Sequence, residues 1–288
     1  MDALFDTELV TIRRRRALQQ PVEGADFLMK LAADELAERL SVVERSFDVA
    51  VELYGGTGAT GEACLATGKI GMLRRIELPD AFARTDATVA TAPLEILPLE
   101  PESANLILSP LSLHLTNDTP GVFIQARRAL RPDGLFLAMI PGAGTLAELK
   151  DVLLQAETEL YGGVSPRVIP FPDVRDVGAL MQRAGFALPV VDAESRTVRY
   201  SSLFSLMRDL RGMGMTNPLV GRSRRPLTRA FFLRAAEIYA ERYADPDGRI
   251  RATFAFINAS GWAPHESQQK PLKPGSAKAR LADALKGR

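Results

Sequence analysis

The segment best suited to chemistry is Glu52-Leu53-Tyr54-Gly55-Gly56-Thr57-Gly58, in which an acid that closes an apolar run is followed by glycines. Glycines lack a Cβ, so their backbone can approach a ligand closely at a turn that opens a helix. A second acid, Glu77, lies 19 residues beyond Gly58, where it could accept hydrogen bonds from the two hydroxyls of a ribose. This pattern predicts a site for a nucleoside-containing cofactor.

The spacing leaves the class of cofactor open. Gly56-Thr57-Gly58-Ala59-Thr60-Gly61 matches the G-x-G-x-x-G turn of nicotinamide dehydrogenases. The spacing acid-x-x-x-G-x-G from Glu52 to Gly58 instead favours S-adenosylmethionine. A lone match of this kind is weak evidence, and a tight strand-to-helix turn without any ligand is the third alternative.

A second candidate segment, Ser109–Asp118, follows a predicted strand at the sheet edge where ligands bind in such folds. It contains His114, one of two histidines, which could shuttle a proton or contact a substrate. A structural histidine among leucines is the simpler alternative. The polar cluster Trp262–Gln268 could form the rim of the site or a C-terminal cap, and the sequence favours neither.

Composition excludes several other kinds of site and protein. The 36 basic and 35 acidic residues nearly cancel, which disfavours a dedicated nucleic-acid binder. The single cysteine, Cys64, excludes a disulfide framework, and no set of residues has the spacing of a zinc site. No apolar run reaches the roughly 20 residues that span a bilayer, and the N-terminus has no secretory pattern. We expect a bacterial cytosolic protein without a metal site or transmembrane segment.

Two clusters have both a structural and a functional interpretation. Arg13–Arg16 is either a solvated helix face or a dock for an acidic or nucleic-acid partner. Three methionines in and beside a predicted helix, Met207, Met213 and Met215, are interpreted as packing residues rather than a binding stripe.

The elements that position these residues alternate between strand and helix up to Pro141. The predicted strands are 47–53, 71–76, 88–92, 105–109 and 135–140, and the predicted helices are 25–46, 59–67 and 120–130. A further helix could start at Pro79-Asp80, and Pro132-Asp133-Gly134 is typical of a tight turn. This alternation predicts an α/β fold with a doubly wound, mostly parallel sheet and helices on both faces.

Beyond Pro141 the pattern changes. Helices are predicted at 145–160, 174–184, 202–213 and 227–243, and strands at 187–200 and 251–259. We divide the chain into an N-terminal helical arm (1–46), one domain (47–267) and a flexible polar tail (268–288).

Motifs spread along the chain resemble those of a known family. They are Ser112-Leu113-His114-Leu115 with Asn117-Asp118, Leu130–Gly134, Thr145-Leu146 with Glu148-Leu149, Ala156–Glu159, Gly163 with Ser165-Pro166, Arg183–Phe186, Leu206-Met207 with Asp209-Leu210, Gly212–Gly214, and Gly261-Trp262 with His265–Gln268. Over about residues 5 to 275 the chain resembles the methyltransferase-like family of the mitochondrial arginine hydroxylase that helps assemble respiratory complex I. It is similar, more distantly, to carboxyl methyltransferases of the biotin pathway.

The resemblance implies a seven-stranded, Rossmann-like class I methyltransferase fold with a helical insertion (201–245) before the last strand, and S-adenosylmethionine as cofactor. His114 becomes the candidate catalytic residue, without metal ligands. The expected cofactor-binding residues are Glu52, Tyr54, Gly55, Gly56, Gly58, Glu77, Leu94, Glu95 and Ser109. The implied partner is a complex I subunit or another protein substrate.

Two residues depart from the family pattern. Tyr54 stands where the first glycine of the cofactor loop is expected, and Pro93 stands near the position of the acid that holds the adenine amino group. Glu95 partly replaces that acid. Both changes are expected to weaken cofactor binding. The alternatives to a methyltransferase are therefore a non-catalytic assembly protein with a lapsed cofactor site, a hydroxylase-type assembly factor and, least favoured, a nicotinamide dehydrogenase.

Overall fold

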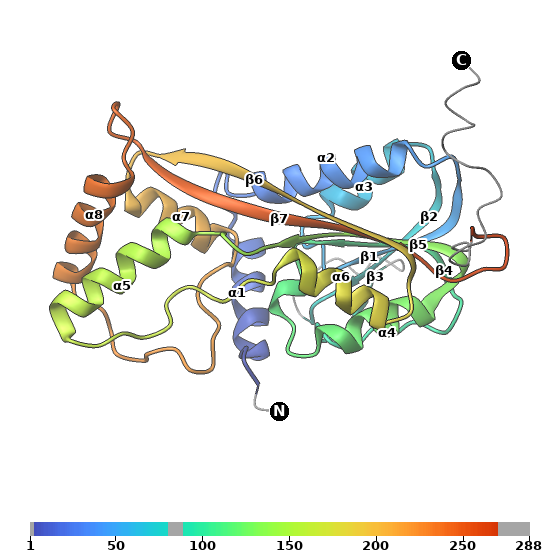
Figure 1. Ribbon diagram of the computed structural model, residues 1–288, viewed down its shortest axis with the longest axis horizontal. Coiled ribbons are helices and arrows are strands. Elements are labelled where there is room, and N and C mark those ends of the chain that lie inside the picture. Colours follow the sequence, from blue (N-terminus) through green and yellow to red (C-terminus); the bar gives the residue numbers. More distant parts are fainter. Residues whose placement is uncertain (1–2, 80–88, 270–288) are drawn as a thin grey trace, which may run out of the picture.

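Seven strands form one sheet within residues 3–79 and 89–269, which the computed structural model describes (Figure 1). Their spatial order is β3-β2-β1-β4-β5-β7-β6. The strands are β1 (Phe47–Leu53), β2 (Ile70–Glu77), β3 (Val89–Thr91), β4 (Ala104–Pro110), β5 (Leu130–Pro141), β6 (Ala187–Tyr200) and β7 (Ile250–Trp262). β1 to β5 pair in parallel, whereas β7 runs antiparallel to both β5 and β6. The predicted doubly wound, mostly parallel α/β fold is confirmed.

Helices cover both faces of the sheet, as the alternation of elements predicts (Figure 1). The helices are α1 (Thr7–Gln19), α2 (Phe27–Ser41), α3 (Ala59–Ala66), α4 (Thr119–Ala129), α5 (Ala147–Tyr161), α6 (Val174–Arg183), α7 (Leu203–Gly212) and α8 (Arg229–Tyr243), with a 3-10 turn at Leu113–Leu115. α2 and α3 share one buried apolar cluster with α5, α7 and α8, and α4 and α6 contribute to the other. Strands buried on both faces explain the near-continuous apolar runs of β1 and β4.

The helical insertion before the last strand is also present. α7 and α8 lie between β6 and β7, which pair along almost their whole length from Tyr200 and Ile250 to Val190 and Ser260. Figure 1 shows α5, α7 and α8 grouped at the end of the β6–β7 pair where Tyr200 lies opposite Ile250. Ser202 caps α7 with its side chain and Thr228 caps α8, so each helix begins where its sequence supplies a hydroxyl.

One predicted turn is wrong. Pro132-Asp133-Gly134 does not precede β5 but lies within it, where the register with β4 shifts between Ala104 and Leu106. Asp133 has a φ of 65°, so the turn-forming residues make a bulge and the strand continues through them. The helix predicted at Pro79-Asp80 and most of the predicted tail, 270–288, lie outside the described residues. Among the helices that the structure describes, none is long and apolar enough to cross a membrane.

Candidate cofactor and acceptor site

The glycine turn follows β1 directly and opens α3. Gly56 and Gly58 have φ angles of 66° and 82°, which L-residues with a side chain rarely adopt. A Cβ on Gly55 would lie 2.1 Å from Oε1 of Glu52, so this backbone passes tightly over a buried carboxylate. A Cβ on Gly56 would meet only Leu18, at 3.8 Å. The turn therefore presents an open backbone at Gly56, as a ligand cradle requires.

Two buried acids beneath the turn share one arginine. Glu52 and Arg75 are paired across β1 and β2, and Nε of Arg75 lies 2.9 Å from Oε2 of Glu52. The other end of the guanidinium lies 2.8 Å from Oε1 of Glu77. Glu77 also accepts a hydrogen bond from the backbone N–H of Gly56 at 3.1 Å. Burial raises the pKa of Glu77 to about 7, against the opposing effect of Arg75.

Tyr54 spans from the glycine turn to the segment that follows β3. Its φ is 53°, and its side chain is only 1% exposed. The hydroxyl lies 2.6 Å from the carbonyl oxygen of Pro93 and 3.1 Å from that of Ile96. Burial raises the pKa of the phenol, so Tyr54 stays a neutral hydrogen-bond donor. The side chain of Tyr54 therefore reaches from the glycine turn to Pro93 and Ile96, in the segment predicted to lie near the adenine.

The remaining predicted cofactor residues lie on β4 and on the segment that follows β3. Leu94 is buried in the same apolar cluster as Tyr54. The carboxylate of Glu95 accepts from the backbone N–H of Asn117 and so faces the Ser109–Asp118 segment. Ser109 is fully buried, 3.0 Å from the hydroxyl of Ser112. The structure therefore brings Glu52, the glycines, Tyr54, Glu77 and Ser109 together at the carboxyl ends of β1, β2 and β4, whereas Glu95 bonds to Asn117.

A cavity of about 660 Å³ opens at the glycine turn. Its walls come from Tyr54–Thr57, the segment joining α1 and α2, and the end of α7. Arg14 of α1 also lines it and donates hydrogen bonds to the carbonyl oxygens of Leu111 (2.9 Å) and Tyr54 (3.3 Å). This cation therefore lies against the start of the glycine turn, within the cavity wall.

Two arginines of the basic run of α1 make contacts within the chain. Arg14 points into the cavity, and Arg13 donates to the backbone carbonyl oxygens of Thr216 (2.7 Å) and Asn217. For these two arginines the solvated face is wrong, and the dock for an acidic partner stays a prediction. They join α1 to the insertion and to the site.

His114 lines a second, smaller cavity of about 230 Å³. Its ring stacks on Phe171, with centroids 6.1 Å apart, and neither ring nitrogen has a hydrogen-bond partner within the part of the chain that the structure describes. Burial, with a smaller contribution from Arg14, lowers the pKa of His114 to about 3. The imidazole is neutral near pH 7 and too weak a base to shuttle protons well, which favours a contact role.

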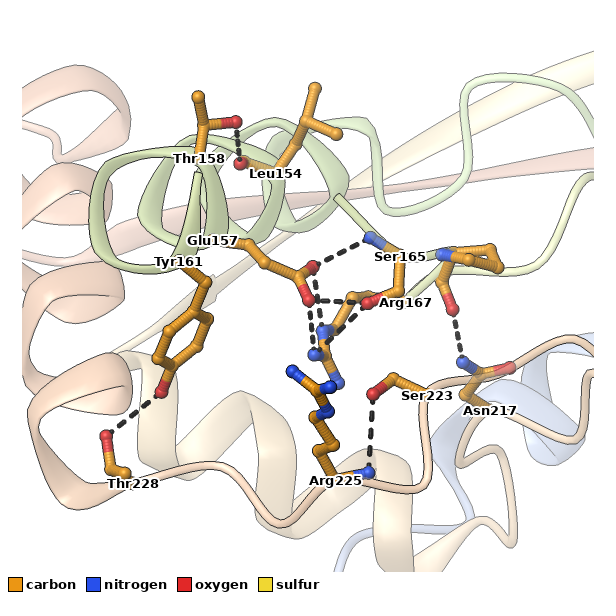
Figure 2. A network of polar contacts seen from close by, with 11 residues as sticks. Leu154, Glu157, Thr158, Tyr161, Ser165, Arg167, Asn217, Ser223, Arg225 and Thr228 are labelled. Carbon is orange, nitrogen blue, oxygen red and sulfur yellow. Dashed lines mark hydrogen bonds and ion pairs between the residues drawn. The ribbon is translucent and has the colours of Figure 1, made fainter. Parts of the chain in front are cut away.

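The outer wall of the His114 cavity is held by the polar network shown in Figure 2. Arg167, which lines the cavity, donates to both carboxylate oxygens of Glu157 at 2.6 and 3.1 Å. Ser165 donates to the same carboxylate through its N–H and hydroxyl. Although burial opposes ionisation, these hydrogen bonds lower the pKa of Glu157. The Arg167 cation is thereby neutralised within the chain.

The polar cluster Trp262–Gln268 is not part of the rim. Trp262 pairs with Leu135 near the start of β5, whereas the glycine turn follows the end of β1. Gln268 donates to Asp133 at 3.0 Å and to the carbonyl oxygen of Ala263 at 2.8 Å. These bonds hold the chain at the opposite edge of the sheet, as the cap interpretation predicts.

Three site residues, Arg75, Met213 and Met215, have no functional role in the sequence-based interpretation, and Arg14 has one only as part of the Arg13–Arg16 run. Arg14 stands in a run of four arginines. Arg75 is a charged residue inside a strand that ends on an acid. The sequence pattern therefore marks both positions as unusual. Met213 and Met215 line the larger cavity, and Met215 also lines the smaller one. Both methionines also pack against the apolar cluster of α2, α5, α7 and α8, so the predicted packing role is confirmed, and their position in a cavity wall adds to it. The two cavities share a wall at Met215.

Comparisons with known proteins agree with this geometry. A family model described as "Methyltransferase domain" matches residues 70–138. The mitochondrial arginine-hydroxylase NDUFAF5 of Dictyostelium discoideum is 37% identical over 97% of this chain and 70% of its own length. The human protein of that name is 36% identical over 95% of this chain and 81% of its own length. A malonyl-[acyl-carrier protein] O-methyltransferase of Laribacter hongkongensis is 31% identical over 95% of this chain and 92% of its own length.

The chain belongs to this methyltransferase-like family. A solved structure, the YcgJ protein of Bacillus subtilis, aligns with a TM-score of 0.54 and 14% identity over 80% of this chain and 98% of that one, which supports the fold alone. S-adenosylmethionine is the cofactor of this class of domain, and the nicotinamide alternative finds no support in the family.

The residues at the glycine turn fit S-adenosylmethionine if the side chain of Tyr54 moves. The larger cavity has the size of a typical cofactor pocket, Gly56 offers open backbone, and Arg14 offers a cation for a carboxylate. Glu77 is the acid predicted to bind the ribose, but its carboxylate already accepts from Gly56 and Arg75. Glu77 is not among the residues that line the larger cavity, whereas Tyr54 is, so a ribose contact at Glu77 requires side chains at the turn to move, and we expect Tyr54 to be the one that moves.

Proposed function

We propose that this chain is an S-adenosylmethionine-dependent enzyme of the methyltransferase class that modifies a protein or a small-molecule acceptor. One observation carries the proposal: the cavity at the glycine turn and the cavity at His114 share a wall at Met215. Transfer between two bound groups requires that both be held in line and close together. Two adjoining cavities at the carboxyl ends of β1 and β4 provide that arrangement.

The roles of the residues follow from their chemistry. The bound cofactor would supply an electrophilic methyl group on a sulfonium. Gly56 and Arg14 would hold its amino-acid end, and Glu77 its ribose hydroxyls. The apolar walls of both cavities exclude water from the space between donor and acceptor. Neutral His114 would orient the acceptor by hydrogen bonding, since its depressed pKa makes it a poor general base.

A second candidate is an assembly protein that no longer binds cofactor. Tyr54 favours it, because the ring fills part of the nucleoside path and is held there by Pro93 and Ile96. The relatives named arginine-hydroxylase NDUFAF5 suggest a subunit of respiratory complex I as a protein partner. Such a partner, and a location in the bacterial cytosol, belong to the proposal for either candidate.

Calorimetric titration of the full chain with S-adenosylmethionine and with S-adenosylhomocysteine tests the proposal. The protein is dialysed first to remove carried-over ligand. We expect stoichiometric binding of both ligands. Gly56→Arg should abolish it, because the new side chain would enter the larger cavity from the open position of the turn.

Gly68→Arg is the matched control. Gly68 also has a left-handed φ, of 72°, and its added Cβ would meet nothing within 4 Å, but it lies away from both cavities. It should bind cofactor like the parent chain. Absence of binding to the parent chain at millimolar ligand would reject the enzyme and leave the assembly protein.

A further inference from the structure

His114 has an unmet requirement for a polar partner. The side chain is buried, and both ring nitrogens lie without a hydrogen bond among the described residues. Leaving a buried donor or acceptor unpaired costs about 1–3 kcal/mol per group. Since the ring lines a cavity of about 230 Å³, a ligand that enters this cavity can supply the missing partners.

The cavity is mostly apolar, and His114 is the buried polar side chain in its wall, with Arg167, Arg211, Thr216 and Asn217 among the other lining residues. Its walls include leucines of α5, the ring of Phe171 and two methionines of the insertion. A ligand that reaches His114 should therefore do so on an apolar stem, which the leucines, Phe171 and the methionines can cover. A neutral imidazole has one donor and one acceptor, so the end group should accept one hydrogen bond and tolerate or donate another.

The charges around the cavity disfavour a cation. Among the described residues that line it, none is acidic. The nearest carboxylate behind the wall, Glu157, is occupied by Arg167 and Ser165. Arg211 lines the cavity and is exposed, and Arg14 acts on His114 from the cofactor side. Burying a cation without a counter-charge is costly, whereas an anion or a neutral carbonyl group meets favourable charges.

We infer that the His114 cavity binds a carboxyl-type group, a carboxylate or a carboxamide, at the end of an apolar stem, and excludes a guanidinium. The inference rests on the proposed function only in calling this ligand the acceptor. It separates the two kinds of relative, since one is named for arginine and the other for a malonyl group.

The chain's two histidines allow a direct test. We would record the ring-nitrogen resonances of His114 and His265 by NMR in protein labelled with ¹⁵N-histidine, without cofactor. The probes share a butyl stem and differ in the head group: pentanoate, pentanamide and butylguanidinium. Pentanoate, pentanamide or both should shift the His114 nitrogens. Butylguanidinium should bind at least about tenfold more weakly. The exposed His265 should not respond.

Val168→Phe gives a second check, because Val168 is half-buried in the cavity wall and the larger ring would fill the space. It should abolish the response. Val198→Phe, equally half-buried but lining neither cavity, should retain it. A His114 shift with butylguanidinium as strong as that with pentanoate, or no shift with any probe, overturns the inference. Neither result bears on cofactor binding, which the titration tests separately.

Discussion

The two ends of the site differ in how their buried polar groups are satisfied. At the glycine turn, Glu52, Arg75 and Glu77 pair with one another, and Tyr54 bonds to Pro93. At the second cavity, His114 has no partner among the described residues. A ligand at the first end must displace internal contacts, whereas a ligand at the second only adds contacts. The cofactor end is therefore expected to be gated and the acceptor end preformed.

The largest effect is expected from a substitution at the cofactor end of the site. Arg75→Met removes the single cation shared by two buried carboxylates, and losing one partner of a buried ion pair costs about 3–5 kcal/mol of unfolding free energy. Urea denaturation measures this loss. Arg199→Met, which removes an exposed pair with Asp245, should change stability little. Equal effects of the two variants would contradict the buried network.

The opposite result is expected at the acceptor end. His114→Leu replaces an unsatisfied buried ring by an apolar side chain, and should raise the unfolding free energy by about 1–3 kcal/mol. His265→Leu, at an exposed position, should stay within about 0.5 kcal/mol of the parent. A clear loss of stability in His114→Leu would mean that the imidazole has partners in solution.

The pH dependence of stability should have opposite signs at the two ends. His114 has a pKa lowered from 6.5 to about 3, so the unfolded chain binds more protons in that window and stability rises with pH. Glu77 has a pKa raised from 4.5 to about 7, so the folded chain binds more protons and stability falls with pH.

Urea denaturation between pH 4.5 and 6.5 separates the two groups. Relative to the parent, Glu77→Gln should make stability rise more with pH, and His114→Leu should make it rise less, each by at most about 1.4 kcal/mol per pH unit. If both variants changed the slope in the same direction, one of the two pKa shifts would have the wrong sign.

The smallest expected change tests whether the Tyr54 side chain obstructs the cofactor site. Tyr54→Phe removes the hydroxyl that bonds to Pro93 and should cost about 0.5–1.5 kcal/mol of stability. Because the ring is then released, cofactor should bind more tightly by calorimetry. Tyr239→Phe also loses a buried hydroxyl bond, to the carbonyl of Arg251, and should cost similar stability with no change in cofactor affinity. Weaker binding to Tyr54→Phe would mean that the phenol contacts the cofactor.

Much of the fold follows from the sequence, because apolar runs such as Phe47–Leu53 and glycines such as Gly58 determine local structure. The sequence predicts a turn at Pro132–Gly134 where the structure has a bulge, because a strand can continue through such residues when its neighbours hold it. The site is less predictable, since it depends on contacts between distant segments. Arg14 reaches Leu111 across 97 positions of the chain, and the direction of its side chain is set by packing.

The central claim is that the glycine turn is a cofactor site gated by Tyr54. A crystal structure of the full chain grown with S-adenosylhomocysteine tests it most directly. The account predicts the ligand along Gly55–Thr57, with its ribose at Glu77 and the Tyr54 hydroxyl more than 3.5 Å, roughly the limit of a hydrogen bond, from the Pro93 carbonyl. A chain that crystallises without ligand there, or that binds it with Tyr54 still bonded to Pro93, would contradict the account.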